Sequence, residues 1–125
     1  AEGLKLREVL GAAPVIYVLD GCVGESAAAL RGADLRPILN HGDQLTAWRS
    51  GGGGACGLQI DTGINRLGFR PEDAPAAFHG LDLVMSHLAC ADDPDSPMNA
   101  RQRDAFAAIA ALYPGVTRSF ANSGG

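Results

Sequence analysis

The sequence predicts an α/β fold in which parallel strands alternate with helices, as in part of a (β/α)8 TIM barrel. Helix-like and strand-like segments alternate along the whole chain at a spacing typical of about five β/α units. A complete barrel of this kind needs about 250 residues, and this chain has 125. We therefore expect residues 1–125 to form a single partial domain of a barrel. A flavodoxin-like open sheet fits the same alternation.

Apolar periodicity and chain breakers predict the elements of the first half. These are a helix over 2–10, a strand over 14–19, a helix over 25–31, a strand over 35–39 and a helix over 43–49. In the first helix, Leu6, Val9 and Leu10 recur at i, i+3 and i+4. The first strand is apolar throughout, which is typical of a strand buried on both faces. The second strand is weaker, because Pro37 has no N–H to donate to a neighbouring strand.

The second half follows the same pattern after a glycine-rich stretch. The predicted elements are a surface loop over 51–54, a strand over 55–60, a short helix over 71–78, a strand over 81–88, a helix over 99–113 and a strand over 116–121. Pro71 suits the first position of a helix. The last helix carries the clearest apolar stripe, formed by Phe106, Ile109, Ala110 and Tyr113.

Composition narrows the class of protein. Hydrophobic residues make up 46% and charged residues 19%, and the net charge is −4, as in ordinary globular domains. Because phosphate contacts need clustered Lys and Arg, nucleic acid is not an expected partner. No apolar run approaches the roughly 18 residues of a membrane span. We expect a cytoplasmic protein that does not bind a membrane.

Cysteine spacing and the chain ends add two further expectations. Cys22, Cys56 and Cys90 have no C-x-x-C spacing, so reduced and mostly buried thiols are favoured over disulfides or a zinc site, and no metal site is predicted. The chain has no initiator Met and stops at a glycine pair directly after a predicted strand. We therefore expect a fragment of a longer protein.

Polar turns follow three of the predicted strands, where functional residues of α/β folds lie. The turn after the third strand carries Arg66 between Gly63 and Gly68, and these glycines permit tight backbone turns. Arg66 could present its planar guanidinium to an anionic oxygen. Alternatively, it could form a surface ion pair with Asp61.

The other two turns follow the fourth and fifth strands. His87 follows the fourth, where a lone histidine is more often packed or solvated than catalytic. Asn122 and Ser123 follow the fifth strand and precede two glycines. Such a stretch can form a phosphate-binding nest of N–H groups or an ordinary turn.

Taken together, these stretches resemble one enzyme family. Residues 61–68 (DTGINRLG) resemble the DTGMxRxG signature of bacterial alanine racemases, and residues 87–92 (HLACAD) resemble their HxAxAD stretch. Residues 121–123 (ANS) resemble the family's phosphate-side motif, and residues 102–106 (QRDAF) its Q-x-x-x-F helix. The order and spacing agree along the whole chain. It would thus run from the helix before the third barrel strand to the end of the seventh.

The resemblance implies an enzyme that uses pyridoxal 5'-phosphate (PLP) to interconvert L- and D-alanine for peptidoglycan synthesis. The family has a (β/α)8 barrel and a C-terminal β-domain, and acts as a head-to-tail homodimer. By this resemblance Arg66 faces the phenolic oxygen of PLP, His87 lies near its ring, Asn122 supports that region, and Ser123 holds the phosphate. The supporting residues would be Gln59, Asp61, Thr62 and Gly63.

The chain departs from the family pattern at the residues that catalyse the reaction. The family's two bases are the lysine that holds the cofactor, at the end of the first barrel strand, and a tyrosine of the partner subunit's C-terminal domain. Lys5 is the only lysine, and it lies on the opening helix. Tyr17 falls in a predicted strand and Tyr113 on a predicted helix, so neither matches that tyrosine. We therefore expect no catalytic residue in this chain and no activity from the chain alone.

Gln59 is a second departure. Many family members carry a lysine at this position that becomes carbamylated and orients the arginine that corresponds to Arg66. A glutamine cannot be carbamylated, so Arg66 would need a neutral amide or a bound anion as its partner.

Two other functions fit some of the same residues. A related PLP racemase of broader specificity would carry the same cofactor motifs. A free-standing, non-catalytic α/β module that binds a phosphate-bearing ligand would explain the missing lysine, but not the ordered set of motifs.

Overall fold

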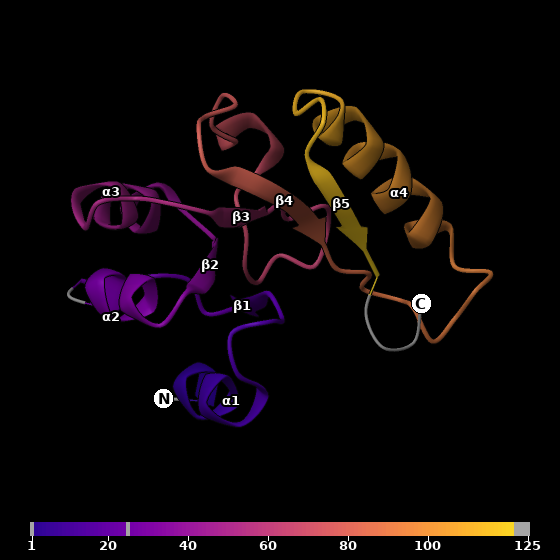
Figure 1. Ribbon diagram of the computed structural model, residues 1–125. Coiled ribbons are helices and arrows are strands. Elements are labelled where there is room, and N and C mark those ends of the chain that lie inside the picture. Colours follow the sequence, from indigo (N-terminus) through magenta and orange to yellow (C-terminus); the bar gives the residue numbers. More distant parts are fainter. Residues whose placement is uncertain (1, 25, 122–125) are drawn as a thin grey trace.

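The computed structural model describes residues 2–24 and 26–121, which form a curled parallel sheet flanked by helices (Figure 1). Within these residues the strands are β1 (Ile16–Val18), β2 (Leu35–Leu39), β3 (Cys56–Gln59), β4 (Leu81–Ser86) and β5 (Thr117–Phe120). All neighbouring pairs are parallel, and the order in the sheet is β1-β2-β3-β4-β5. A flavodoxin-like sheet would have the order 2-1-3-4-5. The strand order therefore confirms the half-barrel and excludes the open-sheet alternative.

Helices lie outside the arc of strands (Figure 1). They are α1 (Glu2–Leu10), α2 (Ser26–Gly32), α3 (Gly42–Ser50), the 3-10 turn η1 (Pro71–Asp73) and α4 (Pro97–Ala110). The larger hydrophobic core lies between α2, α3, α4 and the sheet, where Trp48 and Phe106 pack with Leu58 and Val84. A smaller cluster, formed by Ile38, Leu83 and Met85 with Tyr17 against it, is separate from this core. The sheet therefore has apolar side chains on both faces at its centre.

A one-residue irregularity in β4 adds a polar cluster beside the smaller hydrophobic cluster. Cys56 pairs with Leu81, but the next residue of β3 pairs with Leu83, so Asp82 is an extra residue in β4. Such a bulge redirects a side chain. Asp82 accepts hydrogen bonds from the Arg36 guanidinium and, at 3.1 Å, from the Tyr17 hydroxyl.

The amino-terminal region differs from its sequence prediction. Its strand is only Ile16–Val18 and lies at the edge of the sheet, so burial on both faces is wrong, and Val15 and Leu19 are exposed. The predicted apolar stripe of α1 is not covered either, since Val9 is 81% exposed. The helix is held instead by Arg7.

The Arg7 guanidinium donates to four backbone oxygens, those of Gly11, Pro14, Ala33 and Asp34. The first two belong to the turn that follows α1, and the last two follow α2. Polar contacts, rather than buried side chains, therefore fix α1 against the rest of the described chain.

Two other elements that contain prolines differ from their sequence predictions. The strand containing Pro37 is not weak but lies inside the sheet, between β1 and β3, with Pro37 fully buried. The predicted helix over 71–78 is only the turn Pro71–Asp73, because Pro75 favours an extended Ala74, which has φ −61° and ψ 129°. Tyr113 then donates its hydroxyl to the Pro75 carbonyl oxygen at 2.6 Å.

The remaining elements agree with the prediction to within a few residues. The long helix begins two residues earlier than predicted, at Pro97, and ends at Ala110, so Tyr113 lies in the turn that follows. Cys22 and Cys56 are buried, Cys90 is partly buried, and all three are free thiols as predicted.

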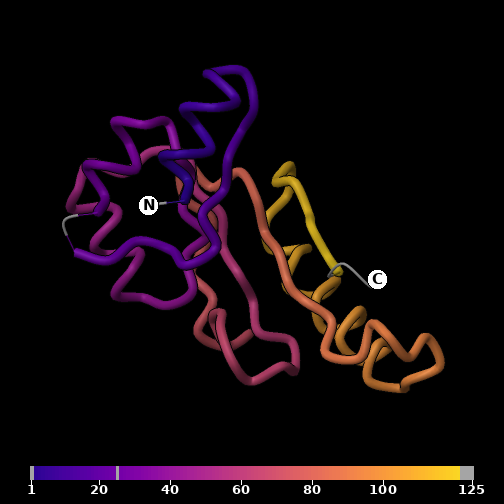
Figure 2. Tube along the Cα trace, turned by 90° about the horizontal axis from the view of Figure 1, so that it is seen from below, coloured from indigo at the N-terminus to yellow at the C-terminus, as the bar shows by residue number. Residues whose placement is uncertain are grey.

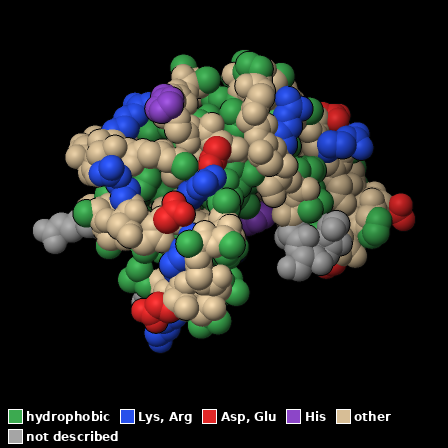
Figure 3. Space-filling view, in the orientation of Figure 1, with side chains coloured by type: hydrophobic (Ala, Val, Ile, Leu, Met, Phe, Trp, Pro, Cys, Tyr) green, Lys and Arg blue, Asp and Glu red, His purple; other side chains and the backbone are tan. Residues whose placement is uncertain are grey.

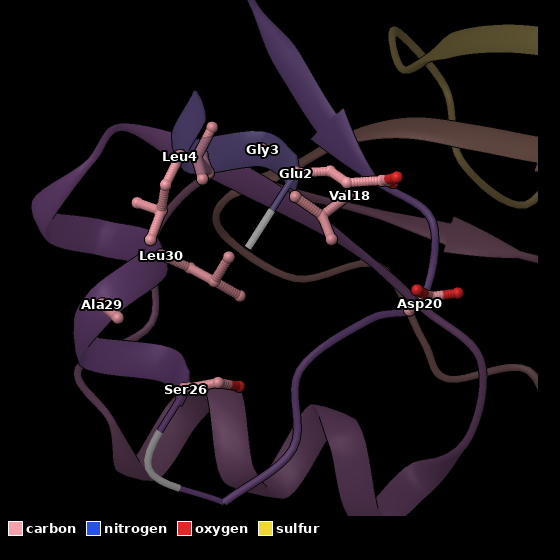
Figure 4. Close-up of a pocket in the computed structure, with 9 residues that line it drawn as sticks. Glu2, Gly3, Leu4, Val18, Asp20, Ser26, Ala29 and Leu30 are labelled. Carbon is pink, nitrogen blue, oxygen red and sulfur yellow. The ribbon is translucent and has the colours of Figure 1, made fainter. Parts of the chain in front are cut away.

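A cavity of about 410 Å³ lies between α1, β1 and α2, with Val18, Leu30 and Leu35 among its lining residues (Figure 4). Leu4, Leu6 and Leu10 of α1 itself are exposed, and Figure 3 shows hydrophobic surface in this lower part of the molecule. β1 and β5 are the two ends of the sheet order, and seen from below α2 and α3 lie on one side of the molecule and α4 and β5 on the other (Figure 2). None of the helices in the described ranges has the length and apolar character of a membrane span.

Candidate functional site at the carboxyl edge of β3 and β4

The turn Asp61–Gly68 leaves β3 and is organised by one carboxylate. Asp61 Oδ1 accepts hydrogen bonds from the backbone N–H groups of Gly63, Ile64 and Asn65, each at 3.0 Å. Hydrogen bonds to an ionised acceptor are stronger than neutral ones. The backbone thus satisfies the Asp61 oxygen that faces the turn, without an arginine.

The base of this turn is closed by backbone contacts. Asp61 N–H donates to the Phe69 carbonyl and Phe69 N–H donates to the Gln59 carbonyl, both at 2.8 Å. At Gly68 (φ +117°) a Cβ would lie 2.8 Å from the Asp61 nitrogen, so only glycine fits this close approach. The turn is therefore a closed loop anchored at both ends to β3.

Arg66 lies in this loop with its side chain exposed. Among the described residues, no carboxylate is paired with Arg66 and no side-chain hydrogen bond holds it, so the alternative ion pair with Asp61 does not form. Arg66 lines an open cleft of about 600 Å³ together with Gly63, Arg70 and Ala105 of α4. Its guanidinium is free to meet an anionic group.

A buried polar network joins the loop to the end of β4. Ser86 donates its hydroxyl to the Ile60 carbonyl at 2.7 Å, and the Thr62 and Ser86 hydroxyl oxygens lie 2.7 Å apart. Because Ser86 uses its proton on Ile60, Thr62 is the donor to Ser86. Gln102 of α4 then donates to Thr62 Oγ1 at 3.1 Å.

The other predicted site residues lie around this network. His87 follows β4 directly and is half-buried, and its carbonyl accepts a hydrogen bond from Gln102 at 3.0 Å. Gln59 is buried and donates from Nε2 to the Leu67 carbonyl at 3.3 Å, so it contacts the backbone next to Arg66 rather than the guanidinium. The structure thus brings the Arg66 loop and the His87 segment together, although His87 does not line the cleft that Arg66 lines.

Two predicted residues, Asn122 and Ser123, lie outside the described residues. Conversely, sequence reasoning assigned no contact role to Ser86 or to Gln102, both of which are fully buried. The four-residue spacing of Gln102, Phe106 and Ala110 signals a buried position for the glutamine. Within the described ranges, no three His, Cys, Asp or Glu side chains gather closely enough to hold a metal ion.

A curled parallel sheet in chain order, with polar turns at its carboxyl edge, defines a protein of the (β/α)-barrel class. Residues 1–125 match the family model described as alanine racemase, N-terminal domain. The chain belongs to this family.

Individual relatives agree with the family model. An alanine racemase of Cereibacter sphaeroides is 47% identical over 130 residues, which cover 99% of this chain and 37% of the relative. The solved alanine racemase of Bartonella henselae, described with covalently bound pyridoxal phosphate, has a TM-score of 0.87 at 28% identity, over 99% of this chain and 38% of that one. A histidine racemase of Leuconostoc mesenteroides has a TM-score of 0.79 at 26% identity, over 98% and 37%. The chain therefore spans little more than a third of the length of these proteins.

Proposed function

We propose that this chain is part of a PLP-dependent alanine racemase that interconverts L- and D-alanine. The observation that carries this proposal is the joining of the Arg66 loop to the His87 segment at one sheet edge. The two stretches correspond to two cofactor motifs of the family in the same order. In this proposal the full-length enzyme is a cytoplasmic homodimer, and its biological role is to supply D-alanine for peptidoglycan synthesis.

The donor set of the described edge fits this cofactor. Within the part of the chain that the structure describes, the Arg66 guanidinium is unpaired and suits the anionic phenolic oxygen of PLP, and the half-buried His87 suits a position beside its ring. Asn122 would support the region near the ring, and Ser123 would hold the phosphate. When bound, PLP supplies an electron sink for loss of the α-proton of the amino acid.

The chain's own residues bind and orient rather than transfer protons. Asp61 accepts hydrogen bonds from the backbone of the loop that carries Arg66, and Gln59 donates a hydrogen bond to the Leu67 carbonyl next to Arg66. Since the Gln59 amide is neutral and contacts a carbonyl, Arg66 keeps its positive charge free for the cofactor. Lys5 lies exposed on α1, and the proton-transferring lysine and tyrosine are expected elsewhere in the enzyme.

The test is racemisation and PLP binding by the full-length protein, with R66A compared against R101A. Arg101 is an exposed arginine on α4 outside the cleft. Loss of a charged hydrogen bond is worth about 1.5–3 kcal/mol, so R66A should weaken PLP binding roughly 10- to 100-fold. R101A should bind PLP as the wild type does. A full-length protein that binds no PLP or leaves L-alanine unchanged would contradict the proposal.

A racemase for another amino acid is the second candidate. The chain is 26% identical in sequence to the solved histidine racemase and 28% identical to the solved alanine racemase of Bartonella henselae. These nearly equal identities support this second candidate. Racemisation rates measured on a panel of L-amino acids decide between the two. A kcat/KM for alanine at least tenfold above all others supports the first.

A further inference from the structure

The Gln102 side chain makes three hydrogen bonds at the candidate site. It lies on α4 with 0% of its surface exposed. Its Oε1 accepts the Ala89 N–H at 2.9 Å, and its Nε2 donates to the His87 carbonyl at 3.0 Å and to Thr62 Oγ1 at 3.1 Å. Both amide protons and the amide oxygen are therefore used.

These three contacts lie on two separate segments. Thr62 belongs to the loop that carries Arg66, whereas His87 and Ala89 belong to the segment that follows β4. Gly63 also packs against this side chain, since a Cβ there would lie 3.4 Å from Gln102 Cγ. One side chain of α4 thus contacts both segments.

A second buried glutamine, Gln44, also links two backbone segments, but away from the candidate site. Gln44 on α3 accepts the Asn40 N–H at 2.8 Å and donates to the Asp20 carbonyl at 3.1 Å. It joins the ends of β1 and β2, away from the Arg66 loop. Gln44 therefore offers a matched control in which the same amide is removed from a similar depth.

We propose that Gln102 is a positioning residue that fixes the Arg66 loop and the His87 segment relative to each other. Without its amide, Ala89 N–H and the His87 carbonyl would lose their partner inside the protein, and Thr62 would lose its link to α4. Unpaired buried polar groups are costly, so both segments would rearrange together. This inference rests on the proposed function only where it concerns PLP.

The first test needs no cofactor and uses amide hydrogen exchange of the cofactor-free, full-length protein. Q102M should accelerate exchange at least tenfold in both residues 62–66 and 87–89. Q44M should accelerate it at residues 19–21 and 40, and leave those two segments unchanged. Acceleration at Ala89 alone, or the same pattern in both variants, would overturn the proposal.

T62V provides a milder variant should Q102M fail to fold. It removes the Thr62 hydroxyl, and with it the contacts to Gln102 and to Ser86, so exchange in residues 62–66 should rise while Ala89 stays protected by the intact amide. Unchanged exchange in residues 62–66 would overturn the proposal.

The second test measures PLP affinity in the full-length protein, alongside the melting temperature of its cofactor-free form. Q102M should weaken PLP binding at least tenfold, and Q44M less than threefold, for a similar loss in melting temperature. Equal weakening by both variants would overturn the positioning role. A wild-type protein that binds no PLP would refute the proposed function instead, and hydrogen exchange would still decide the role of Gln102.

Discussion

The centre of the sheet and its amino-terminal edge are built differently. All four residues of β3 are buried, and the loop that leaves this strand is closed by backbone hydrogen bonds at its base. In contrast, β1 has one buried residue, and α1 has none. The candidate site therefore rests on the part of the chain that is packed on both faces. Rigid packing below a loop fixes the backbone position of the residues that the loop carries.

The sharpest test of this difference compares one apolar truncation in each region. Leu58 is fully buried in β3, so L58A should reduce the free energy of unfolding by about 2–5 kcal/mol. Val9 is 81% exposed, so V9A should change it by less than about 0.5 kcal/mol in the 125-residue chain. Urea denaturation followed by circular dichroism measures both. Similar losses in the two variants would mean that α1 is covered, for example by a second copy of the chain.

Glycines provide a smaller test of the same comparison. A Cβ on Gly57 of β3 would lie 2.5 Å from Ile38 Cδ1 and 3.1 Å from the Leu83 carbonyl oxygen, whereas one on Gly32 meets nothing within 4 Å. G57A should therefore destabilise the chain by about 1–3 kcal/mol through overpacking. G32A should be neutral or slightly stabilising, because it restricts the unfolded chain. Thermal melts of the two variants give the comparison, and a stable G57A protein would show that the sheet centre can expand.

The smallest effect concerns alkaline pH. Burial, with a further contribution from the negative charge of Asp82, raises the pKa of the Cys56 thiol from 9.0 to about 12. The folded state therefore favours the neutral thiol. This stability is fully present below pH 9 and is lost as the pH rises towards 12.

Between pH 8 and pH 10 the Cys56 contribution should fall by about 1 kcal/mol. C56A should lose this part of the pH dependence, while the other titrating groups remain as in the wild type. Unfolding free energies measured at both pH values give the difference. An identical slope in C56A would show that the thiol is not shielded from water.

Much of the fold follows from local sequence patterns. Short apolar runs such as the one that ends at Gln59 identify the strands, and the stripe through Phe106 identifies α4, because burial imposes these periodicities. The edge position of β1 and the interior position of Pro37 were not predictable in the same way. They depend on which strands become neighbours, which is a tertiary property.

The candidate site divides along the same line. The loop with Gly63, Arg66 and Gly68 could be located from sequence, because glycines and polar residues after a strand mark a turn. The partner of Asp61 could not be predicted, since backbone N–H groups outcompete Arg66 for its carboxylate. The contact between Gln102 and Thr62 spans 40 positions along the chain, and local patterns carry no information on it.

Because Asp82 is an extra residue in β4, the effect of deleting a residue from this strand depends on its position. The register of β3 and β4 skips Asp82, so a deletion of this residue would leave the pairs from Leu83 onward intact. It would remove only the acceptor for Arg36 and Tyr17. Deleting a residue further along β4 would instead exchange the two faces of the strand and turn Val84 out of the core. In this strand, natural deletions are therefore expected at a single position.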